Sequence, residues 1–170
     1  MRPVGVLAHI TSLPSGNLSD SLNFIDLLSE IGANAWQMLP INPPDKLRSP
    51  YASLSAFAAW NKLCTSNITA SIKDDIYWLE DWALFSVIRR EYGGAPWSKW
   101  PKELRDRDEN ALAPYKLLIT KEIESQAHFN GQWQQLRVHA TKNNISLIGD
   151  MPIFVAHDSA DVWAHRELFH

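Results

Sequence analysis

The first forty residues contain two short apolar runs separated by one segment with helical periodicity. Residues 3–9 and 35–39 have the length and composition of strands that are buried on both faces. Between them, apolar side chains recur in three-residue steps from Leu22 to Ile31, which predicts a helix over about 20–31. A strand, a helix and a strand with short links form a βαβ unit, so we expect the two strands to pair in parallel.

The ends of this first helix carry recognisable signals. Ser19 or Ser21 is expected to cap its start, and Gly32 stands where a glycine commonly ends a helix. After the second strand, residues 41–51 form a proline-rich loop, because proline cannot continue a strand ladder. The carboxyl ends of parallel strands are where α/β proteins bind ligands, so this loop is a candidate for function.

The middle of the chain, from about residue 54 to 146, has the pattern of helices. Helical spacing over 78–92 stops at a Gly-Gly pair, and a second long helix is predicted to end near Lys142. A single crossover needs far fewer residues, so we expect one crossover helix together with an inserted helical subdomain. Trp78, Trp82 and Trp133 are expected in the core between these helices.

A third apolar run over 145–149 predicts a third buried strand, which leads into Asp150. Asp158 and Asp161 follow and are expected to start a helix, since acidic side chains favour the amino-terminal end of a helix. Three strands with crossover helices cannot close a barrel, which needs eight strands and typically ~250 residues. The pattern therefore fits either a compact three-layer domain or the first part of a larger one.

Composition excludes some classes of function. The chain has 170 residues, with 16 Lys and Arg against 19 Asp and Glu and a formal net charge of −3. This balance argues against a protein that coats nucleic acid or binds a membrane through basic residues. A single cysteine, Cys64, rules out an internal disulfide framework and makes the cytoplasm the expected compartment. The chain shows neither a signal peptide nor an apolar run of transmembrane length.

The sequence lacks several motifs that carry chemistry. It contains no phosphate-binding loop, no dinucleotide glycine pattern, no metal-binding His or Cys motif and no nucleophile elbow. A free-standing nucleotide-binding domain is therefore disfavoured, and neither a cofactor nor a metal is expected. What remains is a set of polar and aromatic residues at predicted strand ends: His9, the Ser49–Tyr51 segment and Asp150. If the sheet is parallel, these side chains share one rim, where hydroxyls, a carboxylate and an aromatic ring would suit a sugar.

Several motifs lie in order along nearly the whole chain: HITSLP at 9–14, WQMLP at 36–40, SPY at 49–51 with LSAF at 54–57, GDMPIFVA at 149–156 and DSADVW at 158–163. They resemble those of the amylomaltases, the family of 4-alpha-glucanotransferases also called disproportionating enzymes. The stretches 77–85 and 93–97 are similar to the helical insertion of that family. Two departures concern the acceptor region: the loop after Pro14 is shorter than usual, and Ala52 stands where a polar residue usually follows the tyrosine.

The resemblance implies an α/β fold that comprises the first three βα units of a (β/α)8 TIM barrel, with a helical insertion between strands 2 and 3. In that arrangement residues 1–56 hold strands 1 and 2 and rim loops. Residues 57–143 form the insertion and crossover helix, and residues 144–170 form strand 3 and the start of the next helix. The implied reaction is retaining transfer of α-1,4-glucan segments between maltooligosaccharides or starch-type glucans, without a cofactor.

The resemblance assigns no catalytic residue to this chain, because the nucleophile Asp, the acid/base Glu and the assisting Asp of the family lie on strands four, five and seven. It implies substrate-binding roles for Tyr51, Asp150, Ser49 and His9. Three of them have a plainer alternative: Asp150 as a carboxylate that holds a loop, Tyr51 as an aromatic packed on the insertion, and His9 as a structural imidazole.

Two functions follow as alternatives. The chain is the N-terminal part of a cytoplasmic glucanotransferase and is inactive alone, or it is a non-catalytic module that binds glucan or a partner, from a truncated or split gene. The partners expected are an α-1,4-glucan or maltooligosaccharide and the missing C-terminal part of the barrel; nucleic acid and membranes are not expected. Unpaired apolar edges on strands 1 and 3 predict that the isolated chain is poorly soluble, oligomeric or partly molten.

Overall fold

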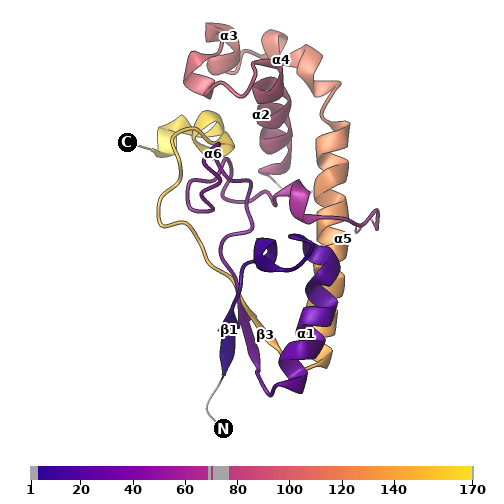
Figure 1. Cartoon of the computed structure of the whole chain (residues 1–170). Helices are drawn as coiled ribbons and strands as arrows, with labels where there is room; N and C mark the ends of the chain where they lie inside the picture. The colour runs from indigo at the N-terminus through magenta and orange to yellow at the C-terminus, as the bar shows by residue number, and fades with distance from the viewer. Residues whose placement is uncertain (1–3, 69, 71–76, 170) are drawn as a thin grey trace. The chain divides into compact units, whose positions relative to one another are not determined.

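The computed structural model describes residues 4–68, 70 and 77–169, which form an α/β structure with a small parallel sheet (Figure 1). The strands are β1 (Gly5–Leu7), β2 (Ala35–Gln37) and β3 (Ser146–Ile148). The helices are α1 (Ser21–Glu30), α2 (Leu79–Glu91), α3 (Lys102–Arg105), α4 (Glu109–Lys116), α5 (Thr120–Lys142) and α6 (Ala160–Ala164). Short 3-10 turns lie at Ile10–Ser12, Leu18–Asp20, Asn61–Leu63, Trp97–Lys99 and Arg166–Leu168.

The chain folds into two compact units, each built from three separate segments. Unit 1 comprises Met1–Ile41, Ala59–Ile72 and Ala127–Met151, and unit 2 comprises Asn42–Ala58, Lys73–Gln126 and Pro152–His170. The sheet and α1 belong to unit 1, and α2, α3, α4 and α6 belong to unit 2. The sequence-based division at residues 56 and 143 stays a prediction.

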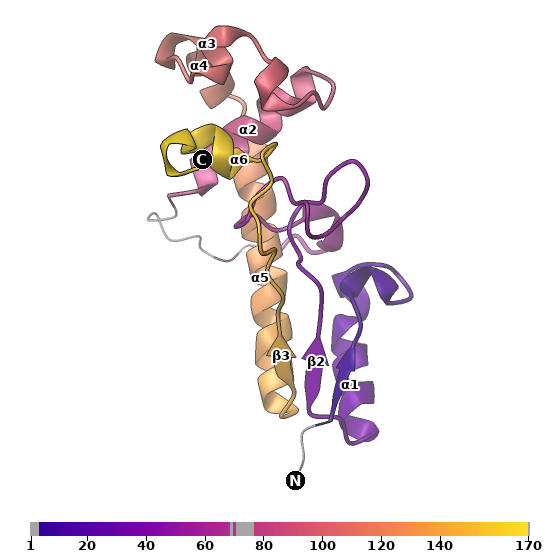
Figure 2. The same cartoon turned by 90° about the vertical axis from the view of Figure 1, so that its left-hand side faces the viewer.

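The sheet of unit 1 has the order β1-β2-β3, and both strand pairs are parallel. Val6, Trp36 and Leu147 are neighbours in its register. This arrangement confirms the predicted parallel pair. α1 and the part of α5 that belongs to unit 1 lie side by side on one face of the sheet (Figures 1 and 2). Connections of one handedness place successive crossover helices on the same face, which accounts for this layout.

The core of unit 1 is centred on Trp36, which is fully buried. Its indole Nε1 donates a hydrogen bond of 2.7 Å to the Ala8 carbonyl just after β1. The ring of Phe24 on α1 meets the Trp36 ring edge-on, with centroids 4.9 Å apart. Trp36 therefore joins the helix layer to two strands. Trp133 was expected among the insertion helices, but it lies against this unit 1 core and stacks on Phe129 at 6.0 Å.

The outer strands are not buried on both faces, which corrects the prediction for them. Leu7 on β1 is 62% exposed and Ile148 on β3 is 44% exposed. Side chains on successive strand residues point to opposite faces, so Val6 and Leu147 face the helices while Leu7 and Ile148 face away from them. Both helices of unit 1 cover the same face, and in Figure 2 the strands lie in front of them. Pro3, the predicted start of the first strand, lies outside the described residues.

The core of unit 2 is aromatic. Phe85 of α2 is fully buried, with its ring centroid 5.4 Å from that of Trp100 and 6.1 Å from that of Trp163 on α6. Trp82 is buried in the same cluster, as expected from its spacing, and Trp78 packs partly buried against it. Segments that are not helical, such as most of 52–60, also occur where a continuous run of helices was predicted.

Helix ends follow the predicted signals in part. Gly32 ends α1 with φ +76°, and Gly93 and Gly94 end α2 with φ +60° and +81°. Neither Ser19 nor Ser21 caps α1, which corrects the prediction. Instead a 3-10 turn precedes the helix, and the side chain of Asn17 accepts the Ser19 N–H at 2.9 Å. Among the described residues, no helix has the length and apolar character needed to span a bilayer.

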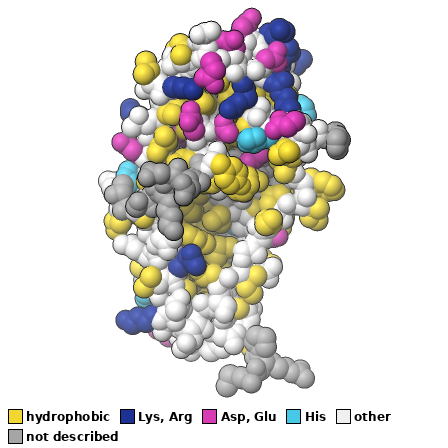
Figure 3. Space-filling view, turned by 180° about the vertical axis from the view of Figure 1, so that it is seen from behind, with side chains coloured by type: hydrophobic (Ala, Val, Ile, Leu, Met, Phe, Trp, Pro, Cys, Tyr) yellow, Lys and Arg dark blue, Asp and Glu magenta, His cyan; other side chains and the backbone are white. Residues whose placement is uncertain are grey.

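Charged side chains of both signs mix on the surface of unit 2. Figure 3 shows Lys and Arg beside Asp and Glu at its α3–α4 end. Several of them form ion pairs: Lys116 with Glu109 at 3.0 Å, and Arg166 with Asp106 at 3.2 Å. Exposed pairs of this kind contribute little stability, and here they balance the local charge.

Candidate functional site

The loop that carries Ser49 and Tyr51 closes on itself in unit 2. The Leu54 amide donates to the Pro43 carbonyl at 2.8 Å, and Pro44 and Ser53 form an antiparallel bridge. The tip of the loop is shaped by the carboxylate of Asp45, whose Oδ1 accepts the amides of Leu47 and Ser49, both at 3.0 Å. Ser49 is therefore held by local bonds. Tyr51 lies two residues further on and is 48% exposed.

Two hydrogen bonds attach this loop to the start of α6. The Ala160 amide donates to the Leu54 carbonyl at 2.9 Å, and the Ala56 amide donates to Asp161 Oδ2 at 2.8 Å. Burial raises the pKa of the Asp161 carboxyl, and the hydrogen bond from Ala56 lowers it by a smaller amount. The position of the Tyr51 loop is thus set by a segment more than a hundred residues away in sequence.

His9 follows β1 in unit 1, immediately before the 3-10 turn at Ile10–Ser12. Burial lowers the pKa of its imidazole, and a hydrogen bond to the backbone of Leu39 opposes that shift. Its Nδ1 is buried and has no hydrogen-bond partner in the described part of the chain. A half-buried neutral imidazole that is bonded to a neighbouring strand end fits the structural alternative for His9 at least as well as a role in sugar binding.

Asp150 follows β3 in unit 1 and is exposed. Its Oδ1 accepts the Met151 amide at 2.8 Å, which fixes the carboxylate against the backbone just past the strand. Because the strands are parallel, Asp150 and His9 both lie at the carboxyl end of the sheet. The predicted rim therefore holds for this pair. Tyr51 and Ser49 belong to unit 2, so the meeting of all four side chains stays a prediction.

Sequence reasoning assigned Asp158 and Asp161 only to the start of a helix. The helix begins at Ala160, and the Oγ of Ser159 caps it by accepting the Val162 amide at 3.2 Å. Asp158 instead pairs with Arg89 of α2 at 2.7 Å and accepts the Trp97 amide at 3.1 Å. Asp161 holds the Ala56 amide. No local pattern could have indicated the contacts of Asp158 and Asp161, because each of them joins residues more than sixty positions apart.

Metal ligands do not gather anywhere in the described ranges: no group of three or more His, Cys, Asp or Glu side chains has the arrangement of a metal site. The chemistry that His9, Ser49, Tyr51 and Asp150 offer is hydrogen bonding and aromatic contact with a polar ligand. A carboxylate accepts hydrogen bonds from hydroxyl groups, and an aromatic face packs against C–H groups.

Comparison with known proteins identifies the family. The family model described as 4-alpha-glucanotransferase matches residues 7–67 and 61–170. This chain belongs to the 4-alpha-glucanotransferase family. It is 34% identical to the 4-alpha-glucanotransferase of Thermus thermophilus and 31% identical to that of Aquifex aeolicus. Each alignment covers 99% of this chain and 46% of the relative, so the chain spans about half the length of these relatives.

Solved structures agree with this assignment. The amylomaltase of Streptococcus agalactiae, solved in complex with acarbose, matches with a TM-score of 0.86 at 27% identity over 99% of this chain and 47% of that one. The amylomaltase of Corynebacterium glutamicum shares the fold with a TM-score of 0.68 at 13% identity, over 96% of this chain and 32% of that one.

The 4-alpha-glucanotransferase relatives also differ from this chain within the matched part. The alignment with the Thermus relative runs over 229 residues, whereas this chain has 170. The family model matches in two pieces that overlap at residues 61–67. The alignment length indicates that the Thermus relative carries additional residues within the matched part, and the split family match indicates a break near residues 61–67, between the Tyr51 loop and α2.

Proposed function

We propose that this chain supplies the N-terminal part of a 4-alpha-glucanotransferase, which transfers segments of α-1,4-glucans between maltooligosaccharides with retention of configuration. The observation that carries the proposal is the 34% identity to the Thermus relative across 99% of this chain and 46% of that protein. The same match supports a description of the fold as the first three βα units of a TIM barrel, with α2 to α4 inserted between β2 and β3.

The contribution of this chain to such a reaction is binding. A retaining transfer needs one carboxylate that attacks the anomeric carbon and one acid that protonates the leaving oxygen. The family resemblance places both on strands that follow residue 170. Asp150, at the carboxyl end of β3, would accept hydrogen bonds from sugar hydroxyls, and the exposed ring of Tyr51 would pack against a sugar face. Ser49 and His9 would complete the binding rim.

The C-terminal part of the barrel would be the protein partner of this chain. Among the described residues, β1 and β3 each pair with a strand on one side only. The sheet face that carries Leu7 and Ile148 leaves both apolar side chains exposed, beside exposed Gln37 and Ser146. Parallel sheets are normally covered on both faces, and barrels have no free edges. The remaining strands of the barrel would therefore cover this face and pair with both edges.

Disproportionation of maltotriose tests the proposal. The 170-residue chain alone should release no glucose. A fusion of this chain to the C-terminal part of the Thermus relative should release glucose and form longer glucans. Asp150→Asn in the fusion should lower kcat/KM about tenfold or more, because the loss of a hydrogen bond between a carboxylate and the substrate costs roughly 1.5–3 kcal/mol.

The matched control is Asp106→Asn, which changes an exposed carboxylate on α3's C-terminal side that pairs only with surface cations. It should leave the rate unchanged. Glucose release by the chain alone would refute its inactivity. A folded fusion that binds maltotriose but transfers nothing would favour the alternative of a non-catalytic glucan-binding module.

A further inference from the structure

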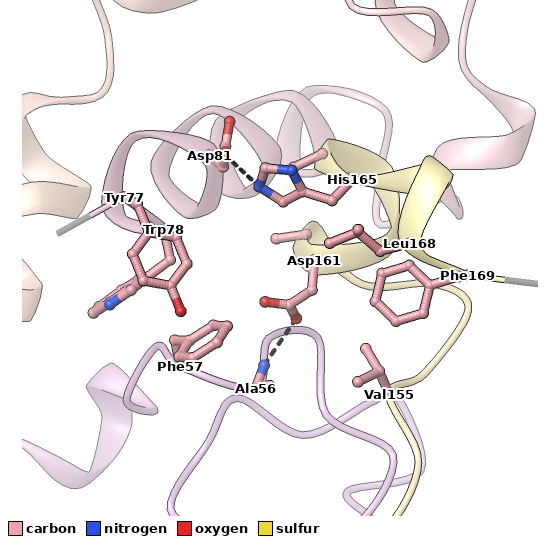
Figure 4. A pocket seen from close by; sticks show the side chains of 12 residues that line it. Ala56, Phe57, Tyr77, Trp78, Asp81, Val155, Asp161, His165, Leu168 and Phe169 are labelled. Carbon is pink, nitrogen blue, oxygen red and sulfur yellow. Dashed lines mark hydrogen bonds and ion pairs between the residues drawn. The ribbon is translucent and has the colours of Figure 1, made fainter.

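A pocket of about 240 Å³ lies wholly within unit 2, and none of the four predicted site residues lines it. Figure 4 shows its walls: Phe57 from the Tyr51 loop, Tyr77 and Trp78 at the start of α2, and Phe169 and Val155 on the opposite side. The Phe57 and Tyr77 rings meet edge-on at 5.4 Å, and Phe57 stacks on Trp78 at 6.3 Å. The pocket is therefore formed by packed side chains that belong to one compact unit.

The carboxylates and the imidazole that line the pocket are engaged with the protein. Asp161 accepts the Ala56 amide at 2.8 Å, and His165 Nε2 lies 3.5 Å from Asp81 Oδ2. The surfaces left open are mainly apolar: Tyr77 is 68% exposed, Leu168 69% and Phe57 48%. An apolar pocket of this kind fits a hydrophobic side chain better than it fits a hydroxyl-rich sugar ring.

A second observation concerns the segment that leads into the pocket. Val155 lines it, and the two preceding side chains, Ile153 and Phe154, are 91% and 81% exposed. Together with the pocket, they make a continuous apolar stretch along the chain on unit 2. Isolated exposed apolar residues are common, but a cluster that adjoins an apolar pocket marks an interaction surface.

The position of the chain end indicates the occupant. Leu168 and Phe169, the last described residues, line the pocket themselves. The matched part amounts to 46% of the Thermus relative, so the polypeptide that follows it there would emerge beside the pocket. We propose that this pocket is an anchor site for an apolar side chain from the C-terminal part of the glucanotransferase. The inference rests on the proposed function and adds unit 2 to the surfaces that the second half contacts.

Hydroxyl-radical footprinting read by mass spectrometry tests this inference. The probe is the rate of oxidation of Tyr77, Phe57 and Phe169 in the 170-residue chain and in its fusion to the C-terminal part of the Thermus relative. In the fusion, oxidation of these three residues should fall at least about threefold. Leu117, which is 83% exposed on unit 2 and lies outside the pocket, is the internal control and should react equally in both proteins.

A charged variant tests the pocket directly. Tyr77→Glu places a charge in the pocket at a mostly exposed position, so folding of unit 2 should survive. It should raise oxidation of Phe57 and Phe169 in the fusion, whereas Leu117→Glu should not. If the fusion does not fold, the same footprint is measured on the chain mixed with the separately expressed C-terminal part, and unchanged oxidation there overturns the proposal.

The outcomes separate this inference from the proposed function. An active fusion whose pocket residues react as in the isolated chain overturns the anchor site and leaves the function standing. A protected pocket in a folded but inactive fusion supports the anchor and contradicts the function. Protection that rises with the concentration of the isolated chain identifies a second copy as the occupant and also overturns the proposal.

Discussion

At the scale of single residues, the carboxylate of Asp161 shows how a partly buried acidic group can serve the fold at a cost. It holds the Ala56 amide, yet burial raises its pKa, so the ionised form is disfavoured in the folded protein. A raised pKa of a carboxyl means that the folded state binds the proton more tightly than the unfolded state. Its contribution to stability is therefore present at low pH and is lost as the pH rises through the folded-state pKa.

Asp161→Asn tests this reasoning. The amide keeps an oxygen that can accept the Ala56 N–H but carries no charge to desolvate. Near pH 7 the variant should have a free energy of unfolding equal to or above that of the parent, and this advantage should shrink as the pH falls through the range in which the carboxyl protonates. Urea unfolding of both proteins between pH 3 and pH 7 measures this difference in the free energy of unfolding.

Asp161→Ala is the control, because it removes the acceptor and leaves the Ala56 amide without its partner. It should lower the free energy of unfolding by about 1–3 kcal/mol. An Asn variant as unstable as the Ala variant would show that the charge, rather than the acceptor, holds the loop.

At the scale of elements, the contact between the segment 65–70 and α5 depends on one glycine. Gly131 is buried on α5, and a Cβ built there would clash with the Ile68 carbonyl oxygen. The Thr65 amide donates to the Gln132 side chain at 2.9 Å, and the Ala70 amide donates to the Ala127 carbonyl at 3.3 Å. Ile68 and Ala70 therefore lie directly against the helix backbone, where no side chain could fit.

Gly131→Ala should release this segment. Alanine favours a helix by up to about 1 kcal/mol over glycine, but overpacking costs about 1–3 kcal/mol, so the net free energy of unfolding should fall or the segment should detach. Limited proteolysis should then cut within 61–70 faster than in the parent. Gln135→Ala, at an exposed position one turn further along α5, should leave the cleavage rate unchanged, and equal cleavage of both variants would contradict the close approach.

Helices α2 and α5 and the three strands could be predicted from the sequence because local periodicity and glycine stops specify them. The start of α1 could not, since a 3-10 turn and Asn17 replaced the expected serine cap. The exposure of one face of β1 and β3 was not predicted either. An apolar strand has the same sequence pattern whether its second face is covered by the same polypeptide or by other residues.

At the scale of the whole molecule, the uncovered sheet face predicts self-association of the isolated chain. Leu7 and Ile148 leave apolar surface open beside strand edges that are unpaired in the described residues. Such edges and faces promote association between chains. Sedimentation velocity of the 170-residue chain should show oligomers whose share grows with concentration.

Leu7→Lys should shift this distribution towards the monomer, because a lysine on an outer strand disfavours edge pairing and apolar contact. Leu117→Lys is the control on a still more exposed leucine of unit 2, and it should leave the distribution unchanged. If the parent chain is a monomer with a sharp, cooperative thermal unfolding transition, three strands suffice for a stable monomeric fold and the prediction is wrong.

The sequence by itself determined the family, the three strands, helices α2 and α5, and the location of His9 and Asp150 at the carboxyl ends of strands. Motifs and hydrophobic periodicity involve residues that are close together in the chain, so they can be recognised in the sequence alone. Tertiary structure alone decided which face of the sheet is covered, how Asp158 and Asp161 tie distant segments together, and that Phe57, Tyr77 and Phe169 enclose an apolar pocket. These features depend on contacts between residues far apart in the chain, and such contacts leave no periodic trace in the sequence.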